Sequence, residues 1–134
     1  LKCIKLNPNY SEARNNLGIV YYQLGKYDEA IKEFEKVLSD VFYKTPQQAY
    51  LNLGLVYFSK GDTRRSIFYF KKAVAIDPNF ALAYQNLGKI NLAKRNYRKA
   101  LECFEEVVRL APGTDMEKQA NERIRWIRTQ GVIR

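Results

Sequence analysis

The strongest constraint on this chain is an internal repeat. The tripeptide Asn-Leu-Gly occurs three times, beginning at Asn16, Asn52 and Asn86, at separations of 36 and 34 residues. A period of this length indicates small structural units that stack on one another, because a single unit cannot bury its own apolar face. The chain is therefore expected to be a repeat protein.

Each unit also carries a small residue followed four positions later by phenylalanine. A small side chain lets two helices approach closely, and the ring fills the space beside that contact. A proline that can end the second helix follows at Pro78 and Pro112, and Pro8 stands in the same context. The three small residues and their phenylalanines are Ala30 and Phe34, Ser66 and Phe70, and Ala100 and Phe104.

Together these positions resemble the tetratricopeptide repeat, whose pattern sets Leu-Gly, Tyr, Ala, Phe and Pro at fixed intervals. Tyr50 and Tyr84 stand where tryptophan is typical, and Arg14 departs from the pattern. The resemblance covers residues 1–112 and implies an all-α fold, a right-handed superhelix of stacked helix-turn-helix hairpins. It implies repeats at residues 11–46, 47–80 and 81–114, after the end of a truncated preceding repeat at residues 1–10.

The hairpin turns are expected at three positions that tolerate left-handed backbone. Gly25 and Gly61 adopt that conformation at little cost, and Asn96 is expected to replace glycine in the third turn. These turns and the apolar spacing predict helices near residues 11–24, 27–40, 47–59, 63–76, 81–93 and 97–110.

A seventh helix is expected to close the array. Met116, Ala120, Ile124 and Ile127 follow one another at spacings of four, four and three, which indicates one apolar helical face. The terminal unit of a solenoid must cover the open end of its neighbour. We therefore expect residues 115–134 to form a capping helix.

The first repeat is two residues too long, because its linker runs from Asp40 to Pro46. Thr45, with proline next and Gln48 three positions on, predicts a capping box at a helix start. The linker is either a structural insertion or, through the apolar pair Phe42 and Tyr43, a contact point on a protruding turn.

The composition argues against an enzyme. The chain has no histidine, which removes the commonest general base and metal ligand at neutral pH. Cys3 and Cys103 lie 100 residues apart without a CxxC or Cys/His neighbour, so neither a metal site nor a disulfide is expected. We expect no catalytic residue and no cofactor.

A ligand is expected in the concave groove lined by the first helix of each hairpin. Asn16, Asn52 and Asn86 recur once per repeat, and an amide can both donate to and accept from the backbone of an extended peptide. Alternatively, these asparagines serve helix packing alone. The apolar centre of the groove favours an apolar or amphipathic peptide. The candidate groove residues are Asn15, Asn16, Ile19, Tyr22, Gln48, Leu51, Asn52, Leu55, Phe58, Gln85, Asn86, Lys89 and Leu92.

The resemblance also bears on the acidic C-termini of chaperones. Tetratricopeptide repeats that grip those tails use Lys, Asn, Asn, Lys and Arg at set places as a two-carboxylate clamp. Of the matching residues here only Asn52 agrees, so a chaperone-tail adaptor is not expected. Those residues are Asn15, Ile19, Asn52, Leu82 and Asn86.

The net charge of +9 is uneven along the chain. Residues 1–46 carry 7 basic and 6 acidic side chains, whereas residues 47–134 carry 16 and 8. Such charge attracts nucleic acid or anionic lipid, but acidic residues interrupt the basic clusters and no RNA-binding signature is present. We interpret the charge as a solvated outer face and expect no specific nucleic acid.

The stretch from Tyr43 to Gly54, with its Tyr-x-Thr-Pro linker, and the later Ala75 to Phe80 resemble the tetratricopeptide lipoproteins of type IV pilus assembly. That resemblance implies an outer-membrane pilotin in the periplasm that binds a secretin subunit and promotes its assembly. The alternatives are a regulatory or adaptor module of a larger cytoplasmic protein, or a binder of nucleic acid or membrane surfaces. Self-association is expected through the truncated N-terminal repeat, at Leu1, Ile4 and Leu6.

Overall fold

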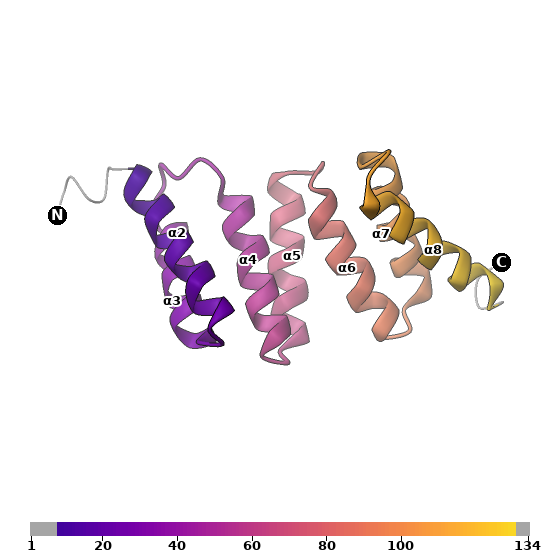
Figure 1. Cartoon of the computed structure of the whole chain (residues 1–134), viewed down its shortest axis with the longest axis horizontal. Coiled ribbons are helices and arrows are strands. Elements are labelled where there is room, and N and C mark those ends of the chain that lie inside the picture. Colours follow the sequence, from indigo (N-terminus) through magenta and orange to yellow (C-terminus); the bar gives the residue numbers. More distant parts are fainter. Residues whose placement is uncertain (1–7, 131–134) are drawn as a thin grey trace. The chain divides into compact units, whose positions relative to one another are not determined.

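A computed structural model describes residues 8–130 of the chain, and over this range the fold is all-α (Figure 1). The expected fold class is confirmed, and each expected helix is present. Helix α2 begins at Pro8, three residues before the predicted start, and α3 ends two residues before its predicted end. The helices are α2 (Pro8–Gln23), α3 (Tyr27–Leu38), α4 (Pro46–Ser59), α5 (Thr63–Ile76), α6 (Ala81–Ala93), α7 (Tyr97–Leu110) and α8 (Asp115–Thr129).

The helices fall into two compact units, residues 1–76 and residues 77–134, which we call unit 1 and unit 2. Unit 1 contains the hairpins α2/α3 and α4/α5, and α3 packs against α4 to join them. Unit 2 contains the hairpin α6/α7, and α8 packs against α7. No helix in the described part is long and apolar enough to cross a membrane.

Each hairpin is held by one glycine packed against one phenylalanine ring. A Cβ atom added to Gly54 would lie 2.6 Å from Cε1 of Phe70, so only glycine lets the two helices approach this closely. Gly18 and Gly88 meet Phe34 and Phe104 in the same way. The three rings are fully buried, and so are the small residues Ala30, Ser66 and Ala100, but the close approach to each ring is made by the glycine.

The hairpin turns use left-handed backbone, as expected, but the third turn uses a different residue. Gly25 and Gly61 have φ of 77° and 86°. In the third turn Arg95 has φ of 64°, whereas Asn96 has φ of −84° and directly precedes α7. The expectation for Asn96 was wrong because the left-handed position is fixed by the repeat register, which places Arg95 at the position of the two glycines.

The long linker between α3 and α4 packs into the core of unit 1 through one of its residues. Tyr43 is buried with Val37 and Ala49, so it belongs to the core, whereas Phe42 is exposed. Burial raises the pKa of the Tyr43 hydroxyl. The predicted contact pair is thus divided between core and surface.

The expected capping box at Thr45 is not formed, because its side chain makes no capping hydrogen bond, although Pro46 does occupy the first helical turn. The reciprocal bonds are found instead at the start of α8. The backbone N–H of Glu117 donates to Oγ1 of Thr114 at 3.2 Å, and its carboxylate accepts from the backbone N–H of Gly113 at 2.9 Å. This is a variant of the capping box, displaced by one residue.

The apolar face expected on α8 is confirmed. Ala120, Ile124 and Ile127 are buried against a cluster on α7, and Met116 packs at its edge. The opposite side of α8 carries Lys118, Glu122 and other exposed polar residues, as a terminal helix requires.

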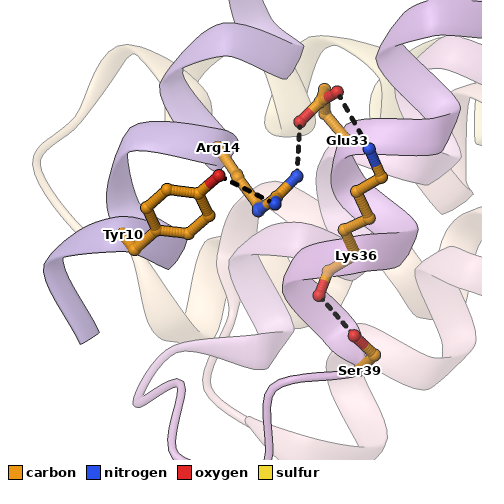
Figure 2. Close-up of polar contacts among 5 residues, drawn as sticks. All are labelled: Tyr10, Arg14, Glu33, Lys36 and Ser39. Atoms are coloured by element: carbon orange, nitrogen blue, oxygen red, sulfur yellow. Dashed lines mark hydrogen bonds and ion pairs between the residues drawn. The ribbon is translucent and has the colours of Figure 1, made fainter. Parts of the chain in front are cut away.

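Arg14, which departs from the repeat pattern, links α2 to α3. Figure 2 shows its guanidinium, with Nη1 3.3 Å from Oε1 of Glu33 and Nη2 donating to the hydroxyl of Tyr10 at 2.9 Å. The other oxygen of Glu33 lies 3.8 Å from Nζ of Lys36. A second ion pair joins α3 to the end of α4, where the hydrogen bond from Lys60 holds the pKa of the Asp28 carboxyl below its ordinary value.

We predict that Gly54→Ala destabilises the protein by about 2 kcal/mol, because the added methyl group overlaps the Phe70 ring and outweighs the better helix propensity of alanine. In a Phe70→Leu background the same substitution should be neutral or stabilising by up to ~1 kcal/mol. Urea unfolding of the four proteins measures this coupling. An equal effect of Gly54→Ala in both backgrounds would contradict the packing argument.

We predict that Arg95→Gly stabilises the protein by about 1 kcal/mol, because it relieves left-handed backbone at a residue with a Cβ atom. Lys94→Gly is the matched control, since Lys94 has φ of −82° in ordinary helical backbone. That control should not stabilise. Thermal unfolding of both variants checks the difference.

Candidate functional site

The candidate site in unit 1 is built by α2 and α4, whose first-helix positions were expected to line the groove. We call this surface the α2–α4 face. Two side-chain hydrogen bonds tie the helices together across it. Its residues are Asn15, Asn16, Ile19 and Tyr22 on α2, and Gln48, Asn52, Leu55, Phe58 and Ser59 on α4.

The first connection is a buried chain of amides. Nδ2 of Asn52 donates to Oδ1 of Asn15 at 3.2 Å, and Nε2 of Gln48 donates to Oδ1 of Asn52 at 3.4 Å. Asn15 and Asn52 are both buried, so this bond pairs the donor of Asn52 with the acceptor of Asn15 away from water. These two asparagines therefore fix the spacing of α2 and α4.

The second connection lies two helical turns further along. The hydroxyl of Tyr22 is 2.9 Å from Oγ of Ser59. Seven residues separate it from the amide pair on both helices, which corresponds to roughly 10 Å along each helix axis. Polar contacts thus bracket a strip of the face.

The strip between these contacts is apolar. Ile19 and Leu55 are half-buried there, on α2 and α4. Phe58, one turn beyond Leu55, has 49% of its surface exposed. A ring of this size exposed beside an apolar strip offers an anchor for a partner's side chain.

The three repeated asparagines do not share one environment. Asn52 is buried in the amide chain, and Asn16 is exposed on α2. Asn86 donates to the backbone carbonyl of Leu82 in its own helix at 2.9 Å. Asn52 has the packing role left open as the alternative, whereas the bond of Asn86 lies within its own helix. The contact of all three with a ligand stays a prediction.

Two further candidate groove residues are buried. Leu51 is fully buried, and Gln85 is buried where its Nε2 donates to Oε1 of Gln119 at 3.3 Å. For Leu51 the prediction does not fit the structure, because the rotation of α4 turns it into the core. In unit 2 Lys89 is exposed, and Leu92 packs beside the cluster of α7 and α8.

None of the residues named for the α2–α4 face is acidic or basic, and the exposed Glu12 lies one turn before Asn15 on α2. Four exposed basic residues of unit 1 lie on α5, at Arg64, Arg65, Lys71 and Lys72, and the other described ones lie on α3 or between helices, at Lys26, Lys32, Lys36, Lys44 and Lys60. On α5, Arg65 is paired, with its Nη1 3.4 Å from the carboxylate of Asp62. Among the described residues no acidic, cysteine or histidine cluster could hold a metal ion. The face can bind by burial and by neutral hydrogen bonds.

The sequence reasoning missed both cross-helix hydrogen bonds. A signal for them exists, because Asn15 and Asn52, like Tyr22 and Ser59, are 37 residues apart, one more than the separation of the first two repeats. Polar pairs at such an offset join corresponding helices of neighbouring repeats.

Comparison with family models gives three matches, each described as a tetratricopeptide repeat. They cover residues 1–32, 48–80 and 81–114. Among curated proteins none matches by sequence.

Several solved structures share this fold. The crystal structure of MamA is 27% identical with a TM-score of 0.78, over 98% of this chain and 74% of that one. The first TPR of Spaghetti (RPAP3), bound to an HSP90 peptide, is 23% identical with a TM-score of 0.79, over 95% and 97%. The Yersinia enterocolitica secretion chaperone SycD, in complex with a peptide of the translocator YopD, is 18% identical with a TM-score of 0.81, over 90% and 93%.

We predict that Asn52→Ala destabilises the protein by roughly 1–3 kcal/mol, because it leaves the buried amide of Asn15 without its donor. In the Asn52→Ala background, Asn15→Ala should lower the free energy of unfolding by about 1 kcal/mol less than it does in the unsubstituted protein. Denaturant unfolding of the two single variants and the double variant measures the cycle. Additive losses would show that the two amides do not act as a pair.

Proposed function

This chain belongs to the tetratricopeptide repeat family, and from that premise we propose that it is a non-catalytic protein-interaction scaffold. Its partner is a peptide or segment that binds the α2–α4 face. The observation that carries the proposal is the half-exposed ring of Phe58 beside the apolar strip of Ile19 and Leu55. A ring exposed next to an apolar strip offers a partner more apolar surface than a singly exposed residue does.

The geometry of the face favours an apolar or amphipathic ligand. The strip lies between two polar connections that already hold α2 and α4 at a fixed spacing, so little ordering of the face is needed on binding. Asn16, exposed beside the strip, has an amide that can donate to or accept from the ligand backbone. The Phe58 ring supplies the central apolar contact.

Two of the similar structures hold peptides, one of HSP90 and one of YopD, and this supports peptide binding by the shared architecture. The acidic HSP90 tail is not the ligand we propose here. Asn15 is buried, Ile19 and Leu82 are apolar, and none of the three offers a cation to a carboxylate.

Within this function we propose assembly of a type IV pilus secretin as the specific role, on the basis of the Tyr-x-Thr-Pro linker. That role would place the protein in the periplasm at the outer membrane. The linker presents Val41 and Phe42 to solvent beside the buried Tyr43, so it adds an apolar contact point outside the α2–α4 face. An adaptor module in a cytoplasmic protein is the competing role, and the same face would serve it.

We predict that Phe58→Ala weakens peptide binding by ~2 kcal/mol or more, because it removes the central apolar anchor. The probe is an array of overlapping peptides that tile the secretin subunit, with scrambled peptides for comparison. The affinity of the best peptide is then measured by fluorescence anisotropy.

Phe68→Ala is the matched control, since Phe68 lies on α5 of the same unit with 52% of its surface exposed against 49% for Phe58. It should leave the affinity unchanged, and charge reversal at Arg64 and Arg65 should alter mainly the salt dependence. Binding that survives Phe58→Ala but is lost on charge reversal would move the site to the basic exterior. If no secretin peptide binds while unrelated amphipathic peptides do, the pilus role fails and the scaffold function stands.

A further inference from the structure

We propose that the outer side of α5 is a second docking surface, which binds an acidic segment of a protein partner that carries one apolar side chain between two carboxylates. We call this surface, centred on Phe68, the α5 face. It lies on a different helix from the α2–α4 face and takes a ligand of opposite chemistry, so it does not depend on the function proposed above. It is also separate from the self-association expected at Leu1, Ile4 and Leu6, which lie outside the described residues.

The α5 face consists of one exposed ring whose helical neighbours on both sides are basic. Phe68 has 52% of its surface exposed. Residues three and four positions before and after it lie one turn away on the same side of the helix. All four are exposed cations, and α5 contains no acidic residue. These four are Arg64, Arg65, Lys71 and Lys72.

This combination occurs in the second repeat and in neither of the others. At the repeat offsets of 36 and 34, the position of Phe68 holds Lys32 on α3 and Glu102 on α7, and both are exposed. The position therefore faces solvent in all three repeats, and packing of the repeat does not require a ring there. The four surrounding positions carry mixed charges elsewhere, with Asp28, Glu29, Glu35 and Lys36 on α3 and Arg98, Lys99, Glu105 and Glu106 on α7.

The Phe68 ring is held in place by its neighbours. It meets the ring of Tyr69 edge-on, with centroids 5.1 Å apart and planes at 81°. Tyr69 in turn stacks on Tyr57 of α4, with centroids 5.5 Å apart and planes at 9°. Nζ of Lys72 lies 5.4 Å from the centroid of Phe68. Because the ring is already ordered, little freedom is lost when a partner covers it.

The four cations form two rows along the helix, and one row is available to a partner. Arg65 is paired with Asp62, and Lys72 lies over the Phe68 ring. Within residues 8–130, Arg64 and Lys71 take part in no ion pair. They lie on one side of Phe68, seven residues apart, which corresponds to roughly 10 Å along the helix axis.

These charges select the occupant. Two carboxylates at that spacing can pair with Arg64 and Lys71 without breaking an existing ion pair, while an apolar side chain between them covers Phe68. Single-stranded nucleic acid stacks its bases on open ring faces, whereas Lys72 lies against a face of this ring. A helix that binds a membrane surface has a broad apolar face, whereas Phe68 stands among four cations. An acidic protein segment fits the surface best.

Two designed helical peptides test the proposal by fluorescence anisotropy with the whole chain. The probe peptide carries Glu, Leu and Glu at positions i, i+3 and i+7, and the comparison peptide carries Gln in place of both Glu. We expect the probe to bind about tenfold or more tightly than the comparison peptide. The double variant Arg64→Gln, Lys71→Gln should weaken probe binding by a similar factor, and Phe68→Ala should weaken it about fivefold or more. Circular dichroism checks that each variant is folded.

The double variant Lys94→Gln, Arg98→Gln is the matched control. It removes two exposed positive charges outside the α5 face, so the net charge falls by the same amount. It should change the affinity of the probe by about twofold or less. Phe58→Ala should leave this affinity unchanged, and that result separates the α5 face from the α2–α4 face.

Equal binding of the two peptides, or no binding of the probe, overturns the proposal. So does an equal loss of affinity in the α5 variant and the matched control, because the attraction would then come from the net charge. The same assay is run with single-stranded polythymidine and with vesicles of phosphatidylcholine and phosphatidylserine. If either binds more tightly than the probe and loses its binding with Phe68→Ala, the α5 face serves nucleic acid or lipid instead of a protein.

Discussion

The contact of one glycine with one phenylalanine ring in each hairpin is the constraint on which the rest of the structure depends. Each phenylalanine ring lies so close to the glycine of the other helix that a Cβ atom there would overlap it. This contact sets the distance between the two helices of the hairpin. In the second repeat Ser66 adds to this contact, because its Oγ donates to the backbone carbonyl of Gly54 at 2.9 Å. Hairpins set in this way place α3 so that α4 can pack on it.

The candidate binding face follows from that arrangement. Once α2 and α4 are each fixed to a second helix, Asn15 and Asn52 come within hydrogen-bond distance, and so do Tyr22 and Ser59. The apolar strip between these pairs is then presented in one conformation. The exposed Phe58 stands out because nearly every other large side chain of α4 is at least half-buried.

The fold could be predicted almost completely, because it is determined by residues that repeat. The Asn-Leu-Gly tripeptides, the paired phenylalanines and the turn glycines each recur at one period, and a period is visible without coordinates. The details that were predicted wrongly each depend on a single residue of the chain. The left-handed residue of the third turn was assigned to Asn96 by residue type, while the register placed it at Arg95. The Thr45 capping box fits a sequence pattern, but its bond depends on a side-chain rotamer that no pattern determines.

Only the outline of the site could be predicted. Sequence spacing shows which residues share one side of a helix, but not how deeply each of them is buried. Leu51 and Asn16 were both expected in the groove, yet one is buried and the other exposed. The rotation of each helix about its axis decides this, and that rotation depends on packing against neighbours. The same limit concealed the pairing of Asn15 with Asn52, which were each expected to face a ligand.

The uncharged residues of the α2–α4 face have a consequence for how binding of the proposed ligand would respond to solution conditions. The polar groups named for it are amides and hydroxyls, and its apolar part consists of Ile19, Leu55 and Phe58, so the proposed contacts with a ligand involve no charged side chain. Attraction of this kind is not screened by ions and does not change with protonation near neutral pH. The affinity of the proposed ligand for this face should therefore change little with salt concentration.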